Sequence, residues 1–126
     1  MFDLNVESLG IGVDIERIDR FRKPVDEKDD RFLNRIFTIA ELDYCLAHAS
    51  PYAHLAVRYA GKEAVVKALN QANITGVNYS DIEILNDSRG IPVVSIKKEV
   101  GHDLVIKVSL SHSDDNAIAF ALVSQL

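Results

Sequence analysis

The sequence RYAGKEAVVKAL, at residues 58–69, has the residue spacing of a helix, and its flanks extend that helix in both directions. Glu63 falls on the same arc as Tyr59 and Ala60, and Lys67 follows one turn later. A soluble helix normally turns such an arc toward the protein core. The two charges therefore form either a surface ion pair at i, i+4 spacing or a charged face turned toward something buried.

Composition restricts the class of protein. The chain has 126 residues, so we expect one domain spanning residues 1–126. Its formal net charge of −5 argues against a nucleic-acid binder that depends on overall basicity. We find no signal peptide and no apolar run long enough to span a membrane. Cys45 is the only cysteine, which excludes an internal disulfide and favours a reducing cytoplasm.

The first half of the chain predicts one strand followed by helices. Residues 9–15 form a short apolar strand that ends near Asp14, and the three-residue apolar spacing in residues 14–21 predicts a helical turn. A charged, proline-containing loop at residues 23–30 precedes a short helix at residues 31–37. Two further helices have start signals: a capping box formed by Thr38 and Glu41, and an N-cap at Ser50 for a long helix that ends near Gln71.

Beyond the long helix the apolar period becomes two. Residues 80–87 and 91–96 read as strands joined by a turn at residues 87–90, where Gly90 can take positive φ. Residues 103–112 and 116–123 form two more strands. A strand, several helices and then a mostly antiparallel sheet predict an α+β fold.

Taken singly, the candidate site residues have ordinary structural explanations. Asp14 would be an N-cap where strand gives way to helix, and His112 a solvated turn residue. Arg58 and Lys62 share one side of the long helix and would be solvated charges. Dinucleotide, Walker, zinc and nucleophile-elbow patterns are not matched. The pattern that remains is two carboxylates, Asp14 and Glu63, far apart in the sequence and each near cations. Such an arrangement is suited to Mg²⁺.

Three segments together resemble the holo-acyl-carrier-protein synthase family, the small 4′-phosphopantetheinyl transferases. They are GIGVDIERIDRF at residues 10–21, RYAGKEAVVKAL at residues 58–69 preceded by RIFTIAELDY, and VSLSHSDDNAIAFALV at residues 108–123. Their order and spacing match, and the resemblance spans nearly the whole chain. It implies the 4′-phosphopantetheinyl transferase fold.

The resemblance also implies a reaction, in which the 4′-phosphopantetheine arm of coenzyme A is transferred to a serine of apo acyl carrier protein and adenosine 3′,5′-bisphosphate is released. Asp14 and Glu63 would hold Mg²⁺, and Lys67 would contact the phosphates. The serine proton would pass to Glu63 or to a metal-bound water. The residues implied at the nucleotide and its 3′-phosphate are Arg58, His112 and Lys62.

The resemblance extends to partners. Acyl carrier proteins are acidic around the modified serine, so the basic residues after the first strand would orient the carrier. Arg20 matches the family's carrier-contacting arginine, and Arg17 lies beside it; Arg22 and Lys23 continue the cluster. Family members of this length are usually homotrimers with active sites between subunits. This chain lacks the usual lysines and arginines at residues 45–57, which leaves His48 and His54 for the coenzyme phosphates.

Two other functions remain open on the sequence. One is a non-catalytic module that binds coenzyme A or a carrier on the same fold, although such a binder has no need of both carboxylates beside Lys67. The other is a metal-dependent phosphohydrolase. The sequence does not identify the carrier protein, whether of fatty-acid or polyketide synthesis, or the selectivity among acylated coenzymes.

Overall fold

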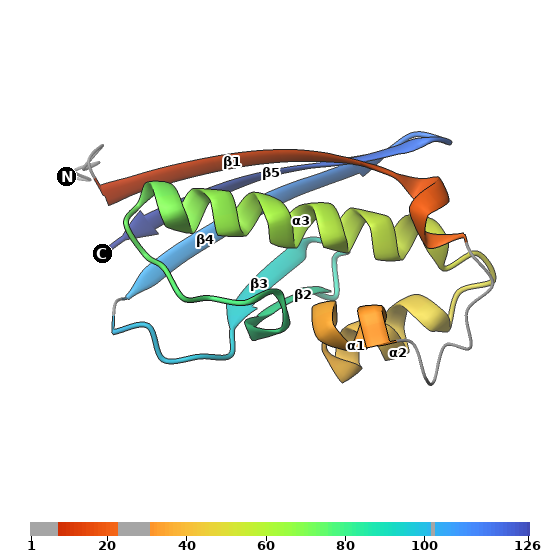
Figure 1. Ribbon diagram of the computed structural model, residues 1–126, viewed down its shortest axis with the longest axis horizontal. Helices are drawn as coiled ribbons and strands as arrows, with labels where there is room; N and C mark the ends of the chain where they lie inside the picture. The colour runs from red at the N-terminus through yellow and green to blue at the C-terminus, as the bar shows by residue number, and fades with distance from the viewer. Residues whose placement is uncertain (1–7, 23–30, 102) are drawn as a thin grey trace.

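The computed structural model describes residues 8–22, 31–101 and 103–126, and it has the predicted α+β fold. Helix α3 lies between a three-stranded sheet on one side and a layer made of α1, α2 and the β2–β3 hairpin on the other (Figure 1). The elements in chain order are β1 (Leu9–Arg17), the 3₁₀ helix η2 (Ile18–Phe21), α1 (Arg31–Ile36), α2 (Ile39–Leu46), α3 (Tyr52–Gln71), the 3₁₀ helix η3 (Tyr79–Asp81), β2 (Ile82–Asn86), β3 (Pro92–Ile96), β4 (Leu104–His112) and β5 (Asn116–Gln125).

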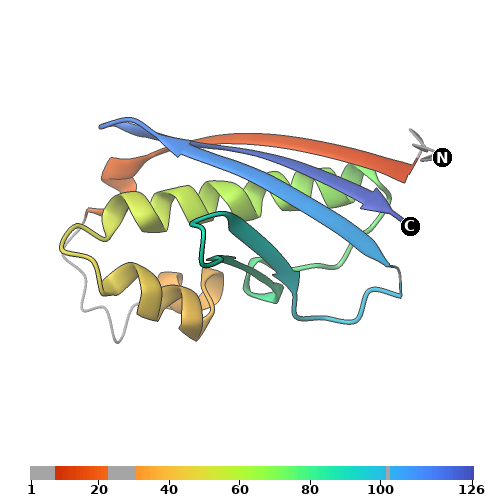
Figure 2. The ribbon, with the colours of Figure 1, turned by 180° about the vertical axis from the view of Figure 1, so that it is seen from behind.

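The larger sheet has the order β1-β5-β4, with both pairings antiparallel, so β5 lies in the middle (Figure 2). On the face of β5 that is turned toward α3 the side chains are small: Ala117, Ala119 and Ala121 are fully buried there. β2 and β3 form a separate antiparallel hairpin, and Gly90 in its turn has φ +79°, as predicted. Among the described residues, no helix is both long enough and apolar enough to cross a membrane.

Two glycines bring α3 into direct contact with β1. A Cβ atom added at Gly12 would lie 2.0 Å from the carbonyl oxygen of Ala64, and one at Gly10 would lie 1.8 Å from that of Ala68. Any side chain at these positions would push the helix away from the strand. The missing Cβ atoms therefore place the charged arc of α3 beside Asp14, the next inward-facing residue of β1.

The opposite face of the same sheet is apolar and exposed. We call it the outer sheet face. Exposure ranges from 43% for Ile118 to 63% for Ile15, and its members are Ile11, Val13, Ile15, Ile118 and Phe120. An exposed apolar patch on two neighbouring strands marks an interaction surface.

Two predicted element boundaries, the end of the first strand and the start of the long helix, were wrong. β1 continues to Arg17 because residues 15–17 pair with β5, so Asp14 lies within the strand opposite Ala119 and is not a helix N-cap. α3 begins at Tyr52 with Pro51 as its N-cap, without a side-chain cap from Ser50. The capping box of Thr38 and Glu41 is confirmed. The predicted loop at residues 23–30, with Lys23, lies outside the described residues.

Candidate active site

Asp14 on β1 and Lys67 on α3 meet where the glycines allow strand and helix to touch. The Lys67 Nζ atom lies 3.3 Å from Asp14 Oδ1 and donates a 3.0 Å hydrogen bond to the carbonyl oxygen of Val13. Glu63, one turn earlier, accepts a 2.8 Å hydrogen bond from the hydroxyl of Tyr79. The ion pairs of the described residues do not include Glu63 with Lys67, so Lys67 bonds across to the strand instead of along its helix.

Glu16 adds a third carboxylate that sequence reasoning missed. Burial raises the pKa of the Glu16 carboxyl, and the hydrogen bond and charge of Asp14 raise it further; the charge of Glu63 acts in the same direction. Arg20 opposes this shift from 3.0 Å away. Residues at i and i+2 on a strand share a face, so the spacing of Asp14 and Glu16 was the available signal. The charges of Asp14 and Glu63 therefore both act on the Glu16 carboxyl.

The residues present fit a hard cation. The Oδ2 atom of Asp14 is buried and has no hydrogen-bond partner within the described structure. Burial raises the pKa of the Tyr79 hydroxyl, its bonded Glu63 raises it further, and the charge of Asp14 also contributes. The charges of Asp14 and Glu63 thus both act on the Tyr79 hydroxyl. The described residues contain no group of three or more His, Cys, Asp or Glu side chains placed to hold a metal ion. Mg²⁺ commonly uses one or two carboxylates, together with phosphates and waters.

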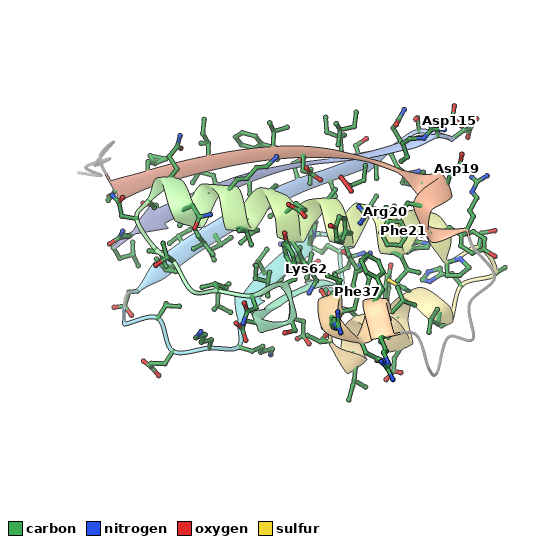
Figure 3. All side chains as sticks on the ribbon, in the orientation of Figure 1. Asp19, Arg20, Phe21, Phe37, Lys62 and Asp115 are labelled. Carbon is green, nitrogen blue, oxygen red and sulfur yellow. The ribbon has the colours of Figure 1, made fainter. Side chains whose placement is uncertain are left out.

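Lys62 lies apart from Asp14 and Lys67, and its burial argues against the predicted contact with the coenzyme nucleotide. Its side chain is fully buried on the side of α3 that faces the β2–β3 hairpin (Figure 3). Its Nζ atom lies 2.7 Å from Glu41 Oε1 and donates to the carbonyl oxygens of Tyr79, at 2.9 Å, and Ile82. Burial lowers the pKa of Lys62, and Glu41 opposes that shift. With protein partners around it, Lys62 is a structural charge and is not the solvated residue that the sequence alone suggested.

Arg58 and His112 line a separate pocket of about 190 Å³. Arg58 is only 2% exposed; its Nε donates to the carbonyl oxygen of Ile84, while its Nη2 is buried without a partner. His54 also lines the pocket and stacks on His48 with ring centroids 3.8 Å apart. No lining residue of this pocket is Asp14, Glu63 or Lys67. Within one chain, the predicted site residues thus fall into two groups.

The predicted carrier-contacting arginines lie at the edge of the carboxylate group. Arg20 pairs with Glu16 and packs its guanidinium 4.9 Å from the ring centroid of Tyr59. Arg17 pairs with Asp19 at 3.3 Å and is largely exposed. Arg20 is therefore fixed by contacts, whereas Arg17 extends into solvent.

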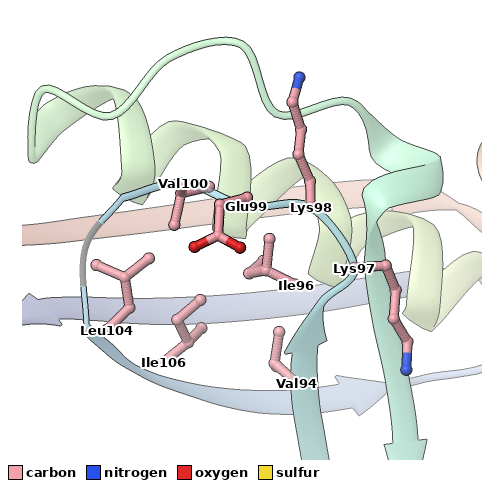
Figure 4. Close-up of a pocket in the computed structure, with 8 residues that line it drawn as sticks. All are labelled: Val94, Ile96, Lys97, Lys98, Glu99, Val100, Leu104 and Ile106. Carbon is pink, nitrogen blue, oxygen red and sulfur yellow. The ribbon is translucent and has the colours of Figure 1, made fainter.

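A further pocket of about 490 Å³ lies between β3 and β4, away from both groups (Figure 4). Its floor is apolar, with Glu99 above it, and Lys97 and Lys98 extend away from the hollow. The apolar floor residues are Val94, Ile96, Val100, Leu104 and Ile106. It contains none of the predicted site residues.

Comparison with known proteins identifies the family to which this arrangement belongs. The model of the 4′-phosphopantetheinyl transferase superfamily matches residues 10–121. The chain belongs to this superfamily, in its holo-acyl-carrier-protein synthase family. The recognition made from three sequence segments is confirmed, and with it the class of enzyme.

Similar holo-acyl-carrier-protein synthases occur in distant bacteria. That of Protochlamydia amoebophila is 44% identical over 93% of this chain and 98% of its own, and that of Thermodesulfovibrio yellowstonii is 40% identical over 91% and 97%. Among solved structures, the synthase of Helicobacter pylori in complex with coenzyme A has a TM-score of 0.74 at 30% identity, covering 90% of this chain and 99% of its own. That of Bacillus anthracis with coenzyme A (3′,5′-ADP) has a TM-score of 0.73 at 30% identity, covering 93% and 96%. These likenesses confirm the synthase fold.

Proposed function

We propose that this chain, acting as one domain in the cytoplasm, transfers the 4′-phosphopantetheine arm of coenzyme A to a serine hydroxyl of apo acyl carrier protein. The serine oxygen forms a bond to the phosphorus next to pantetheine, and the bond to the departing adenosine 3′,5′-bisphosphate breaks. Glu63 or a water at the same site accepts the serine proton. The observation that supports the proposal is the buried, unpartnered Oδ2 atom of Asp14 on a carboxylate that also contacts Lys67. The charges of Asp14 and Glu63 both act on the Tyr79 hydroxyl, which agrees with a shared site.

Asp14 and Glu63 would hold the Mg²⁺. When bound, this ion offsets the charge of the coenzyme A diphosphate, which otherwise repels an oxygen nucleophile. Lys67 contacts Asp14 through its Nζ atom, and its side chain is about half exposed. From that position Lys67 binds a phosphate oxygen and stabilises the negative charge that develops on the leaving group, a task central to phosphoryl transfer.

The nucleotide end of coenzyme A would bind at Arg58 and His112. The unpartnered Nη2 of Arg58 supports this role, because a buried guanidinium N–H gains most from an anionic acceptor. Since this pocket and the carboxylate group share no residue, we propose that a homotrimer joins them, with the outer sheet face covered by neighbouring subunits. Light scattering should give three times the chain mass; a monomer that is fully active would contradict the shared site.

Arg17 and Arg20 would receive the carrier protein. Arg20, which pairs with Glu16, would place the acidic carrier surface near the phosphates, and the attraction of both arginines would steer the encounter. The Michaelis constant for the carrier should therefore rise with salt more strongly than that for coenzyme A. Removal of the Arg17 charge should reduce this salt dependence.

Intact mass spectrometry tests the proposal directly. Several apo carriers are incubated with the protein, with coenzyme A present or absent and with Mg²⁺ present or chelated. The carrier should gain the phosphopantetheine mass only when both are present. Coenzyme A binding without any mass gain would instead support a non-catalytic binding module. Release of bisphosphate in the absence of carrier would support a phosphohydrolase.

A further inference from the structure

Tyr79 contacts the candidate metal carboxylate directly, although it lies outside the three segments that carry the family resemblance. It begins η3, and its hydroxyl donates a 2.8 Å hydrogen bond to Glu63 Oε1. The Tyr79 and Tyr59 rings pack with centroids 6.0 Å apart. The hydrogen bond engages one carboxylate oxygen and fixes the direction in which the other, Oε2, is presented.

The backbone of Tyr79 is held from behind by the buried ion pair. Its carbonyl oxygen accepts a 2.9 Å hydrogen bond from Lys62, which is itself paired with Glu41. The residues that flank Tyr79 are bonded to each other as well: the backbone N–H of Asn78 donates a 2.9 Å hydrogen bond to Asp81 Oδ2. Tyr79 is therefore anchored at its backbone and engaged at its hydroxyl. Because both its backbone and its hydroxyl are held, Tyr79 can fix the rotamer of Glu63 with little further loss of conformational entropy.

We infer that Tyr79 is a positioning residue, which holds Glu63 in the rotamer that receives the divalent cation and is itself held by Lys62. The inference rests on the proposed function. Hydrogen bonds to ligating carboxylates orient them, and removing such an outer partner typically costs about 10- to 100-fold in metal affinity or activity. On this view Lys62 acts on the site through Tyr79, without contact with coenzyme A.

The test replaces one oxygen atom. Tyr79→Phe removes the hydroxyl and keeps the ring that packs on Tyr59, while Tyr52→Phe makes the same change at the exposed start of α3. Binding of Mn²⁺ alone is measured from the electron paramagnetic resonance signal of the free ion. We expect affinity about 10-fold weaker in Tyr79→Phe and unchanged in Tyr52→Phe. Transfer by Tyr79→Phe should recover as Mg²⁺ is raised, since the loss lies in metal binding.

The outcomes separate the inference from the reaction. If the wild type modifies the carrier but Tyr79→Phe binds Mn²⁺ equally well, the inference is wrong and the proposed function stands. If Mn²⁺ affinity depends on Tyr79 but no carrier is modified, the inference stands and the proposed reaction is wrong. A wild type that binds no Mn²⁺ overturns the inference, and the carrier assay then decides the reaction on its own. Loss of transfer that added Mg²⁺ does not restore also overturns the positioning role.

The anchor is tested by a variant that removes both buried charges. In Glu41→Gln/Lys62→Met neither charge is left buried without its partner, so the variant is expected to fold. Neither residue reaches the metal carboxylates, yet Mn²⁺ affinity should fall several-fold because the carbonyl of Tyr79 loses its donor. Unchanged affinity in the folded double variant would overturn the anchoring role of Lys62.

Discussion

Lys62 and Glu63 are neighbours in the sequence, but the fold uses their charges in opposite ways. Lys62 is fully buried, with a carboxylate at 2.7 Å and two backbone carbonyls as acceptors. Glu63 is half-buried, its charge acts on the Glu16 carboxyl, and it accepts a hydrogen bond from the hydroxyl of Tyr79. One residue along a helix is a rotation of about 100°, which is enough to turn one side chain to the β2–β3 hairpin and the other to β1.

The difference teaches that burial alone does not mark a functional charge. What distinguishes the two regions is whether the polar atoms are satisfied. The Lys62–Glu41 pair has protein partners on each charged group, including the backbone N–H of Ile84 at 2.8 Å from Glu41 Oε2. Beside Glu63, the Oδ2 atom of Asp14 is buried with none. An unsatisfied buried atom costs stability unless a ligand completes it.

The largest effect is expected from breaking the satisfied pair. Lys62→Met leaves Glu41 buried without its cation, and the free energy of unfolding should fall by about 3–5 kcal/mol. Urea denaturation followed by circular dichroism measures this change. Glu41→Gln/Lys62→Met is the matched control and should recover much of the loss, because no charge remains uncompensated. Equal stability of Lys62→Met and wild type would show that the pair is not the structural element described here.

A substitution in the unsatisfied region beside Asp14 should instead reduce activity and leave stability nearly unchanged. Glu63→Gln is nearly isosteric, so the free energy of unfolding should change by no more than about 1 kcal/mol. Carrier modification should fall by at least about 100-fold, the scale on which preorganised electrostatic groups act. Initial rates from intact mass spectrometry measure it. Turnover equal to wild type would contradict the role assigned to Glu63 in holding Mg²⁺.

Local pattern in the sequence was sufficient to predict the helix that carries four of the candidate residues. Helical spacing put Glu63 and Lys67 on one arc and Arg58 and Lys62 on another, and all four residues lie in α3. It could not tell which arc faces a ligand. The partner of Lys62 is Glu41 on α2, predicted only as a capping residue, and its second carboxylate oxygen bonds β2. Such a contact depends on tertiary packing, which helical periodicity does not encode.

The same limit explains the misplaced end of β1. Residues 15–17 have a helical apolar spacing, but pairing with β5 keeps them extended and leaves Ile15 on the outer sheet face. Long-range pairing thus overrode local propensity. The glycines at positions 10 and 12 belong to the strand predicted at residues 9–15. Their role became evident only from the 2.0 Å approach of the Ala64 carbonyl oxygen to the place of a Cβ atom.

Arg58 sharpens the comparison because it combines both features. It is as buried as Lys62, but its Nη2 is unsatisfied, so by the same criterion it should serve a ligand. Arg58→Lys keeps the charge and removes the planar fork. We expect the Michaelis constant for coenzyme A to rise about 10-fold with little change in the turnover number, as measured in initial-rate assays. A change in the turnover number alone would contradict a binding role.

The smallest effect is expected from His54, which lines the same pocket. Burial lowers the pKa of His54, and the nearby charges of His48 and Arg58 lower it further, with His112 acting in the same direction. The unfolded chain, with a histidine pKa of about 6.5, therefore takes up a proton before the folded chain does. The contribution of His54 to stability is present above pH 6.5 and is lost as the pH falls through the lower, folded pKa.

Thermal unfolding between pH 8 and pH 5 measures this contribution. His54→Gln should flatten the decline in stability at the acidic end, and a decline identical to wild type would assign it to other groups. Saturating adenosine 3′,5′-bisphosphate should also reduce the decline, because a phosphate in the pocket favours the protonated imidazole. The Lys62–Glu41 pair is already satisfied and has no free polar contact for the ligand. In Glu41→Gln/Lys62→Met the bisphosphate should therefore still reduce the decline in stability at acidic pH.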